Sequence, residues 1–168
     1  TMFVGPSGIG KKKVALAFAQ ALICEEAELA CGVCGPCLRV EKQQSESLVV
    51  LAPDTELARP TIKVEKIRDL LSSLSLANLG VARVVIIDQA HLMNPQAANA
   101  LLKTLEEPAE GLYFILLAAD VHQFLPTIRS RVQAVRFTAL KYEEIKKIKN
   151  SYTNILSTKS TYGNTLGK

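Results

Sequence analysis

The 168-residue sequence is poor in aromatic residues and contains no long hydrophobic run. Aromatic residues make up 5% of the chain and Trp is absent. No apolar stretch approaches the roughly 20 residues that a membrane span requires, and the first residues do not resemble a secretory signal. We therefore expect a cytoplasmic protein that does not interact with membranes. The composition, 48% hydrophobic and 21% charged, predicts one soluble domain with its own core.

A broad excess of positive charge is also missing. Residues 1–140 hold 14 basic and 14 acidic side chains, whereas residues 141–168 hold six Lys and two Glu. The net charge of +4 therefore comes from the C-terminal segment alone. A nucleic-acid-binding domain usually carries its basic residues on a patch of its own surface, so the charge gives little support for direct DNA binding.

Short apolar strands alternate with helical patterns along the chain. The predicted strands are residues 2–4, 48–51, 83–88, 112–119 and 132–137. Helical spacing relates Val14, Phe18, Ala21 and Leu22, and then Ile67, Leu70, Leu71 and Leu74. Nearly continuous apolar strands in such an alternation predict an α/β fold, with a parallel sheet covered by helices on both faces.

The clearest helix follows the strand at 83–88. Asn94 is a typical N-cap, Pro95 suits the first helical position, and Pro108 marks the end. Its expected inner face consists of Ala98, Leu101, Leu102 and Leu105. We assign residues 1–140 to one domain. Residues 141–168 are expected to form a brief helix and a mobile tail.

The segment "GPSGIGKK" between the first strand and the first helix resembles a phosphate-binding loop. Gly5, Gly8, Gly10 and Lys11 fit the pattern in which backbone N–H groups and a lysine surround phosphate oxygens. The hydroxyl residue that would ligate magnesium is replaced by Lys12. The loop therefore predicts a nucleotide-type fold, while ATP binding and hydrolysis at this site are doubtful.

A carboxylate ends the central strand in "IIDQAH". Asp88 lies where P-loop ATPases place a magnesium-ordering Asp, but the next residue is Gln89, whose amide cannot act as a general base. Read alone, Asp88 is better explained as an ordinary strand-end or helix-capping residue, and only its combination with the glycine-rich loop favours a role in a nucleotide site. The residues around His91 and His122 match no recognisable motif, and neither histidine is expected to be a metal ligand or a general base.

All four cysteines lie within 14 residues, at positions 24, 31, 34 and 37. The spacing C-x6-C-x2-C-x2-C, with Gly32, Gly35 and Pro36 available for turning, predicts a zinc site built from Cys24, Cys31, Cys34 and Cys37. Disulfides would be disfavoured in a reducing cytosol. Four protein ligands leave no open position, so the zinc would be structural, in a module inserted at residues 24–37.

These motifs, together with "NALLKTLEEP" and "LPTIRSRV", occur in the order seen in bacterial DNA polymerase III clamp loader subunits. Over about residues 2–140 the chain resembles the AAA+ P-loop domain of the delta-prime subunit, and the tau/gamma motor subunit is a close relative. The resemblance implies membership of a hetero-oligomeric ring, with tau/gamma and delta as partners, that loads the sliding clamp on primed DNA. In that case the chain is part of the DNA polymerase III holoenzyme.

The resemblance also implies a role for "SRV". Ser130 and Arg131 match a family motif, Ser-Arg-Cys, whose arginine reaches into the ATP site of the neighbouring subunit; Val132 departs from it. From the residues alone, Arg129, Arg131 and Arg136 would be a solvated basic edge. Where motor subunits sense the γ-phosphate, this chain has Ala118 and Ala119, which cannot hydrogen-bond phosphate through a side chain.

Three hypotheses result. The leading one is a scaffold subunit without ATPase activity of its own, which supplies Arg131 as an arginine finger in trans. The second is an ATP-hydrolysing subunit of the tau/gamma type, in which Ser7 or another residue replaces the missing magnesium ligand. The third is a zinc-containing DNA-binding module that acts alone.

Overall fold

The computed structural model describes residues 1–26, 30–55, 59–75, 82–141 and 143–147. The chain divides into two units, Thr1–Phe137 and Thr138–Lys168. In the second unit residues 143–147 are helical, and the predicted tail from residue 148 onward lies outside the described residues. Among the described residues, no helix combines the length and the hydrophobicity needed to cross a membrane.

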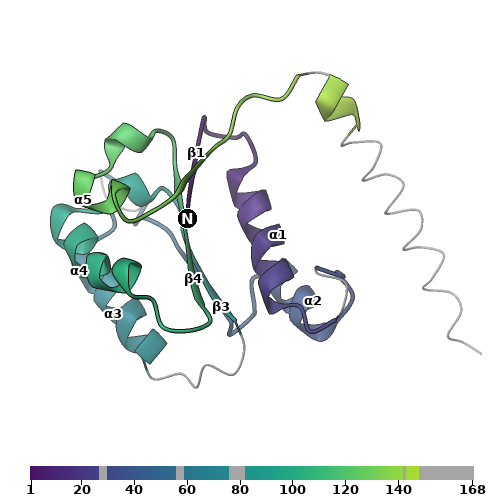
Figure 1. Cartoon of the computed structure of the whole chain (residues 1–168), viewed down its shortest axis with the longest axis horizontal. Helices are drawn as coiled ribbons and strands as arrows, with labels where there is room; N and C mark the ends of the chain where they lie inside the picture. Colours follow the sequence, from purple (N-terminus) through teal and green to yellow (C-terminus); the bar gives the residue numbers. More distant parts are fainter. Residues whose placement is uncertain (27–29, 56–58, 76–81, 142, 148–168) are drawn as a thin grey trace, which may run out of the picture. The chain divides into compact units, whose positions relative to one another are not determined.

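The first unit is built on a five-stranded sheet in the order β2-β3-β4-β1-β5 (Figure 1). All neighbouring strands are parallel. The strands are β1 (Met2–Val4), β2 (Leu48–Leu51), β3 (Arg83–Ile87), β4 (Leu112–Ala118) and β5 (Ala134–Arg136). Because the strands are parallel, the segments that follow β1, β3 and β4 emerge at one edge of the sheet, which is where ligands bind in such folds.

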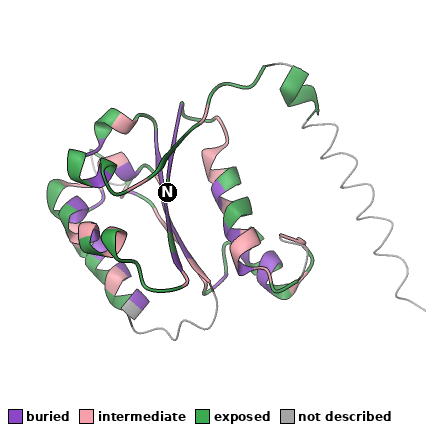
Figure 2. Cartoon of the chain, viewed as in Figure 1, coloured by how far each residue is buried: buried purple, intermediate pink, exposed green. Residues whose placement is uncertain are grey.

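Helices cover both faces of the sheet (Figure 1). One layer contains α1 (Lys11–Ile23) and α2 (Gly35–Glu41); the other contains α3 (Val64–Ser75), α4 (Pro95–Glu106) and α5 (Pro126–Arg129). Successive residues of a strand face opposite layers. In β3, Val84 and Ile86 belong to the core under α1 and α2, while Val85 and Ile87 belong to the core under α3 and α4. This two-layered core confirms the predicted α/β fold, and in Figure 2 the buried colour follows β1, β3 and β4 and the inner sides of the helices.

The caps of α4 agree with its sequence signals. The Asn94 side chain accepts a hydrogen bond from the Ala97 N–H at 2.7 Å, and Pro95 begins the helix. The buried residues of α4 are Ala97, Ala98 and Leu101. The buried face of the helix is therefore rotated by part of a turn from the predicted one. Leu102 and Leu105 pack only partly against the core.

Two expectations about the N-terminal layer need correction. Helix α1 exists, but its buried stripe consists of Ala15, Ala19 and Ile23, whereas Phe18 is 52% exposed. Small alanines let the helix axis approach the sheet closely, which leaves the larger apolar side chains outside. Gly35 and Pro36, expected to form a turn, instead begin α2, because proline suits the first turn of a helix.

Two short 3₁₀ turns, Ala90–Leu92 and Val121–Gln123, follow β3 and β4. They connect these strands to α4 and α5, so the residues after Asp88 and after Ala119 lie at the same edge of the sheet as the glycine-rich loop. The strand predicted at 132–137 is shorter than expected, and all three residues of β5 are exposed, as befits an edge strand.

Candidate functional site

The glycine-rich loop has a conformation that its glycines make possible. A Cβ atom on Gly5 would lie 2.3 Å from the carbonyl oxygen of Phe137, so only glycine lets the end of β5 approach the loop. Gly10 caps α1 with φ at 98°, in the left-handed region that glycine favours. The first intrahelical bond then runs from Val14 N–H to Gly10 O, at 3.1 Å. The preceding N–H groups at this helix N-terminus are therefore available for an anion.

Lys11 contacts its own loop in this structure. Its Nζ donates to the carbonyl oxygens of Gly5 and Pro6, at 2.6 and 2.8 Å. A P-loop lysine must instead direct its ammonium at phosphate oxygens. The side chain therefore has to leave these carbonyls before it can bind a phosphate, and its charge meanwhile stabilises the loop.

Lys12 forms an ion pair with the carboxylate at the end of β3. Its Nζ lies 3.3 Å from Asp88 Oδ2, with 43% of the Lys12 side chain and 26% of the Asp88 side chain exposed. The other oxygen, Asp88 Oδ1, accepts a hydrogen bond from the Gln89 N–H at 3.0 Å. Both carboxylate oxygens are thus engaged within the chain. The carboxylate that would order a metal ion in an ATPase is neutralised here by an ammonium group.

A cavity of about 400 Å³ opens between the loop and the ends of β3 and β4. It brings together most of the residues expected at a nucleotide site, and its lining includes Gly8, Gly10, Lys11, Lys12, Asp88, Gln89, Ala118 and Ala119. The side chains at the end of β4 are methyl groups, so this wall offers no side-chain hydrogen bond to a phosphate or a water.

His91 also lines this cavity, although its sequence context gave no reason to expect it there. Its Nδ1 is buried and makes no hydrogen bond to the described residues. Burial, and secondarily the positive charge of Lys11, lower the pKa of this imidazole. The ring is therefore neutral near pH 7. The only sequence signal was its position three residues after a strand-ending carboxylate.

The four cysteines converge, as their spacing predicted. Their Sγ atoms all lie within 4.8 Å of one another. Cys24 Sγ is 4.0 Å from Cys34 Sγ, and Cys31 Sγ is 4.0 Å from Cys37 Sγ. A tetrahedron of thiolates around zinc, with bonds of about 2.3 Å, has edges of about 3.8 Å. The observed arrangement is therefore close to the size that a zinc ion requires.

The protonation behaviour of the cluster also fits a cation. Backbone hydrogen bonds, first of all from Cys31, lower the pKa of the Cys24 thiol to about 7. Burial raises the pKa of the Cys37 thiol to about 12, so a bare thiolate is disfavoured at that position. A metal ion would stabilise the thiolate there. The cluster is anchored to α1, because Gln20 Nε2 donates to Cys37 O at 3.1 Å.

Arg131 follows α5, outside the cavity at the glycine-rich loop. Its Nε and Nη2 both contact Glu106 Oε1. Its Nη1 donates to Thr127 O at 2.8 Å and to Ser130 Oγ at 3.2 Å. The structure thus gathers the loop residues with Asp88, and the cysteines with one another, but it keeps Ser130 and Arg131 apart from both groups. Sequence reasoning did not identify Glu106, which is the last residue of α4.

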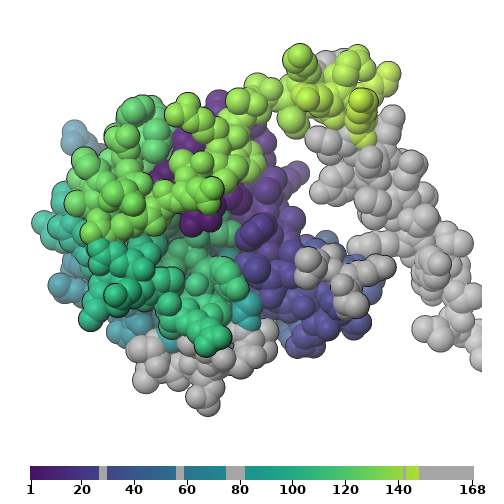
Figure 3. All heavy atoms as spheres, viewed as in Figure 1, coloured from purple at the N-terminus to yellow at the C-terminus, as the bar shows by residue number. Residues whose placement is uncertain are grey.

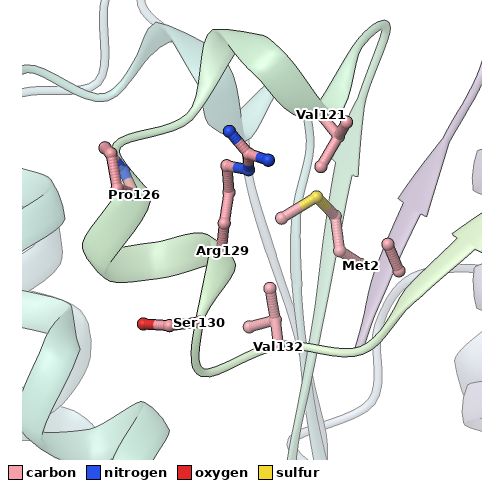
Figure 4. Close-up of a pocket in the computed structure, with 7 residues that line it drawn as sticks. Met2, Val121, Pro126, Arg129, Ser130 and Val132 are labelled. Atoms are coloured by element: carbon pink, nitrogen blue, oxygen red, sulfur yellow. The ribbon is translucent and has the colours of Figure 1, made fainter.

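Arg129 has a different environment from Arg131. It lines a cavity of about 450 Å³ together with Met2, Val121 and Pro126. Its side chain extends toward Val121 and Met2, whereas the Ser130 hydroxyl points to another side (Figure 4). The neighbouring arginines therefore provide a natural comparison, one directed into a cavity and the other bound to a carboxylate.

Taken together, the strand order, the loop between β1 and α1 and the carboxylate after β3 define a P-loop domain of the AAA+ class. Solved structures of two Thermotoga maritima proteins have the same fold. A DNA polymerase III gamma subunit-related protein matches with a TM-score of 0.58 and 25% identity, over 89% of this chain and 44% of that one. The T158V variant of RuvB matches with a TM-score of 0.58 and 16% identity, over 93% of this chain and 43% of that one, and this likeness concerns the fold alone.

The particular family follows from the sequence comparison. Residues 1–141 match the model of the family described as DNA polymerase III, delta subunit, and the chain belongs to this family. Its relatives include DNA polymerase III subunit delta' of Pseudomonas aeruginosa, 39% identical over 133 residues. DNA polymerase III subunit tau of Escherichia coli is 36% identical over 148 residues. The resemblance to DNA polymerase III clamp loader subunits is thereby confirmed.

The match covers most of this chain but a minor part of those relatives. It spans 77% of this chain and 40% of the Pseudomonas aeruginosa protein. For the Escherichia coli tau subunit the corresponding shares are 86% and 22%.

Proposed function

We propose that this chain is a delta-prime-type clamp loader subunit, a scaffold that does not hydrolyse ATP and that supplies Arg131 to the ATP site of a neighbouring subunit. Its partners would be tau/gamma and delta in a hetero-oligomeric ring, which places the sliding clamp on primed DNA in the cytoplasm. The Pseudomonas aeruginosa relative, named as subunit delta', supports this choice.

The observation that carries the proposal is the ion pair between Lys12 and Asp88. A magnesium ion needs oxygen ligands and usually a Ser or Thr hydroxyl at the position of Lys12. Here an ammonium group lies 3.3 Å from the carboxylate oxygen instead. Magnesium would have to displace a like-charged group to reach Asp88. The ion pair therefore opposes magnesium binding, which metal-assisted hydrolysis requires.

Two further replacements support the same conclusion. Gln89 follows Asp88 and is exposed beside the cavity, but its amide cannot accept a proton from an attacking water. Ala118 and Ala119, at the end of the neighbouring strand β4, also line the cavity. A catalytic site would need a base and a γ-phosphate contact in these places.

An arginine supplied in trans must be exposed on the domain and must lie away from the domain's own nucleotide cavity. Arg131 meets both conditions, because it is exposed and does not line the cavity at the glycine-rich loop. A guanidinium stabilises the charge that develops on the γ-phosphate, which is worth on the order of 10³-fold or more in related enzymes.

The test is the ATPase rate of the assembled clamp loader containing Arg131→Ala. We expect turnover at the neighbouring site to fall by about 10³-fold while the circular dichroism of the isolated chain is unchanged. Arg129→Ala is the matched control, since it removes the same charge two residues away and should retain activity. An Arg131→Ala loader with full activity would eliminate the trans role.

The 36% identity to the Escherichia coli tau subunit, together with the intact Gly8, Gly10 and Lys11, favours a tau/gamma-type ATPase as the second candidate. The two candidates differ in how this chain binds nucleotide. Titration with a fluorescent ATP analogue should show no micromolar, magnesium-dependent binding if the chain is a scaffold. Such binding, with turnover by the isolated chain, would favour the second candidate.

We also propose that Cys24, Cys31, Cys34 and Cys37 hold a structural zinc ion. The distances of 4.0 Å between paired sulfurs support this assignment. When bound, zinc would stabilise the segment that includes α2, because the sheet does not run through it. A stand-alone DNA-binding role is less well supported, since residues 1–140 carry equal numbers of acidic and basic side chains.

A further inference from the structure

The contacts of Arg131 leave its guanidinium with little capacity to bind anything else. Guanidinium has five N–H donors on three nitrogens, and all three nitrogens are engaged within the chain. Nε and Nη2 contact Glu106 Oε1, and Nη1 donates to Thr127 O and Ser130 Oγ. The carboxylate also neutralises the charge that a γ-phosphate would require.

We propose that Glu106 is a positioning residue that holds Arg131 in a withdrawn state, from which the arginine is released when a neighbouring subunit presents its nucleotide. This inference rests on the proposed trans role of Arg131 and concerns its regulation. The guanidinium exchanges one anion for another, the Glu106 carboxylate for the γ-phosphate. An unassembled subunit would then keep its arginine paired, and engagement would have to compete with the ion pair.

The location of the pair suits such an exchange. The Arg131 side chain is 31% exposed and the Glu106 side chain 45%, so both groups are accessible to a partner. They come from two elements of the same unit, the end of α4 and the residue after the α5 C-cap. In the space-filling view the atoms of these two regions adjoin on the visible face (Figure 3). Exposed ion pairs are weak and screened by salt, so this one can be broken on binding.

We expect the fold to tolerate the loss of the negative charge of Glu106. A carboxylate at the C-terminal end of a helix is electrostatically unfavourable, so replacing it by an amide should not weaken α4. Glu107, the C-cap of α4, is exposed as well, and the partners of Arg131 are Glu106, Thr127 and Ser130 rather than Glu107. Glu107→Gln therefore removes the same charge one position away and serves as the matched control.

The experiment compares ATP turnover by assembled clamp loaders that differ only in this subunit. Glu106→Gln should raise turnover at the neighbouring site by about 2- to 5-fold, the range that the loss of an exposed ion pair allows. Glu107→Gln should leave it unchanged. The ratio of the Glu106→Gln rate to the wild-type rate should decrease toward one as KCl increases, because salt already weakens the pair in the wild type.

A double-mutant cycle separates this proposal from a merely structural effect. In an Arg131→Ala background, Glu106→Gln should have no effect, because the released group is gone. Turnover that is unchanged or lowered by Glu106→Gln in the presence of Arg131, or raised in its absence, would overturn the withdrawn state. If Arg131→Ala itself leaves turnover intact, the trans role fails first, so the two failures are distinguishable.

Discussion

Replacing Lys12 with serine should make nucleotide binding by this chain depend on magnesium, and we expect no such dependence in the wild type. The Lys12 ammonium lies 3.3 Å from Asp88 Oδ2, where it competes with a metal ion for the same carboxylate. The serine hydroxyl would remove this competitor. It would also supply the oxygen that a P-loop uses as a magnesium ligand.

The magnitude follows from the charges. Two unit charges about 4 Å apart interact by about 1 kcal/mol even in bulk water, so a divalent ion near the ammonium is opposed by about 2 kcal/mol. That energy corresponds to about 30-fold in affinity. The Lys12 side chain is 43% exposed, so water screens this repulsion, and any less polar surroundings would only increase it.

The assay is equilibrium titration with a fluorescent ATP analogue, in magnesium and in EDTA. The wild-type chain should bind the analogue with similar dissociation constants in both buffers. Lys12→Ser should bind the analogue at least about 30-fold more tightly in magnesium than in EDTA. Lys42→Ser, which removes the same charge at the end of α2, should behave like the wild type. Strong magnesium dependence in the wild type, or none in Lys12→Ser, would show that Lys12 does not compete with magnesium for Asp88.

Three further predictions concern other parts of the molecule. Arg131→Ala should lower the rate of hydrolysis at the neighbouring site in the assembled loader by about 10³-fold, while Arg129→Ala should leave this rate unchanged. Metal analysis of the purified protein should find about one zinc per chain. Cys34→Ser or a strong chelator should release the zinc, and circular dichroism should then show less helix but an intact sheet. A fully folded, metal-free protein would contradict the zinc assignment. Gly5→Ala should lower the free energy of unfolding by about 1–3 kcal/mol, because its Cβ would lie 2.3 Å from Phe137 O. Thermal denaturation measures this loss, and Gly35→Ala, whose Cβ would approach only the flexible end of Arg39, should cost much less.

Much of the fold could be predicted because its signals are local. The apolar strand at 83–87 and the Asn94–Pro95 start of α4 were both visible as short patterns. The cysteine spacing predicted a cluster, and the four sulfurs do converge. Each of these features depends on neighbouring residues, so the sequence alone contains the necessary information.

Contacts between distant residues were much harder to predict. Nothing local indicates that Ala15 and Ala19, rather than Phe18, face the sheet, since that depends on how closely the helix approaches. The pairing of Glu106 with Arg131 joins residues 25 positions apart, and that of Lys12 with Asp88 joins residues 76 positions apart in the sequence. The sequence showed that Lys12 could not ligate a metal ion. Only the structure shows that its ammonium lies beside the carboxylate such an ion would need.

The most direct measurement is ATP turnover by the neighbouring motor subunit, alone and assembled with this chain in wild-type and Arg131→Ala form. A subunit that only donates its arginine should stimulate the neighbour strongly as wild type and not at all as Arg131→Ala, and should hydrolyse no ATP by itself. Equal stimulation by both forms, or ATP turnover by this chain without its neighbour, would contradict the proposal that this chain donates Arg131 and does not hydrolyse ATP itself.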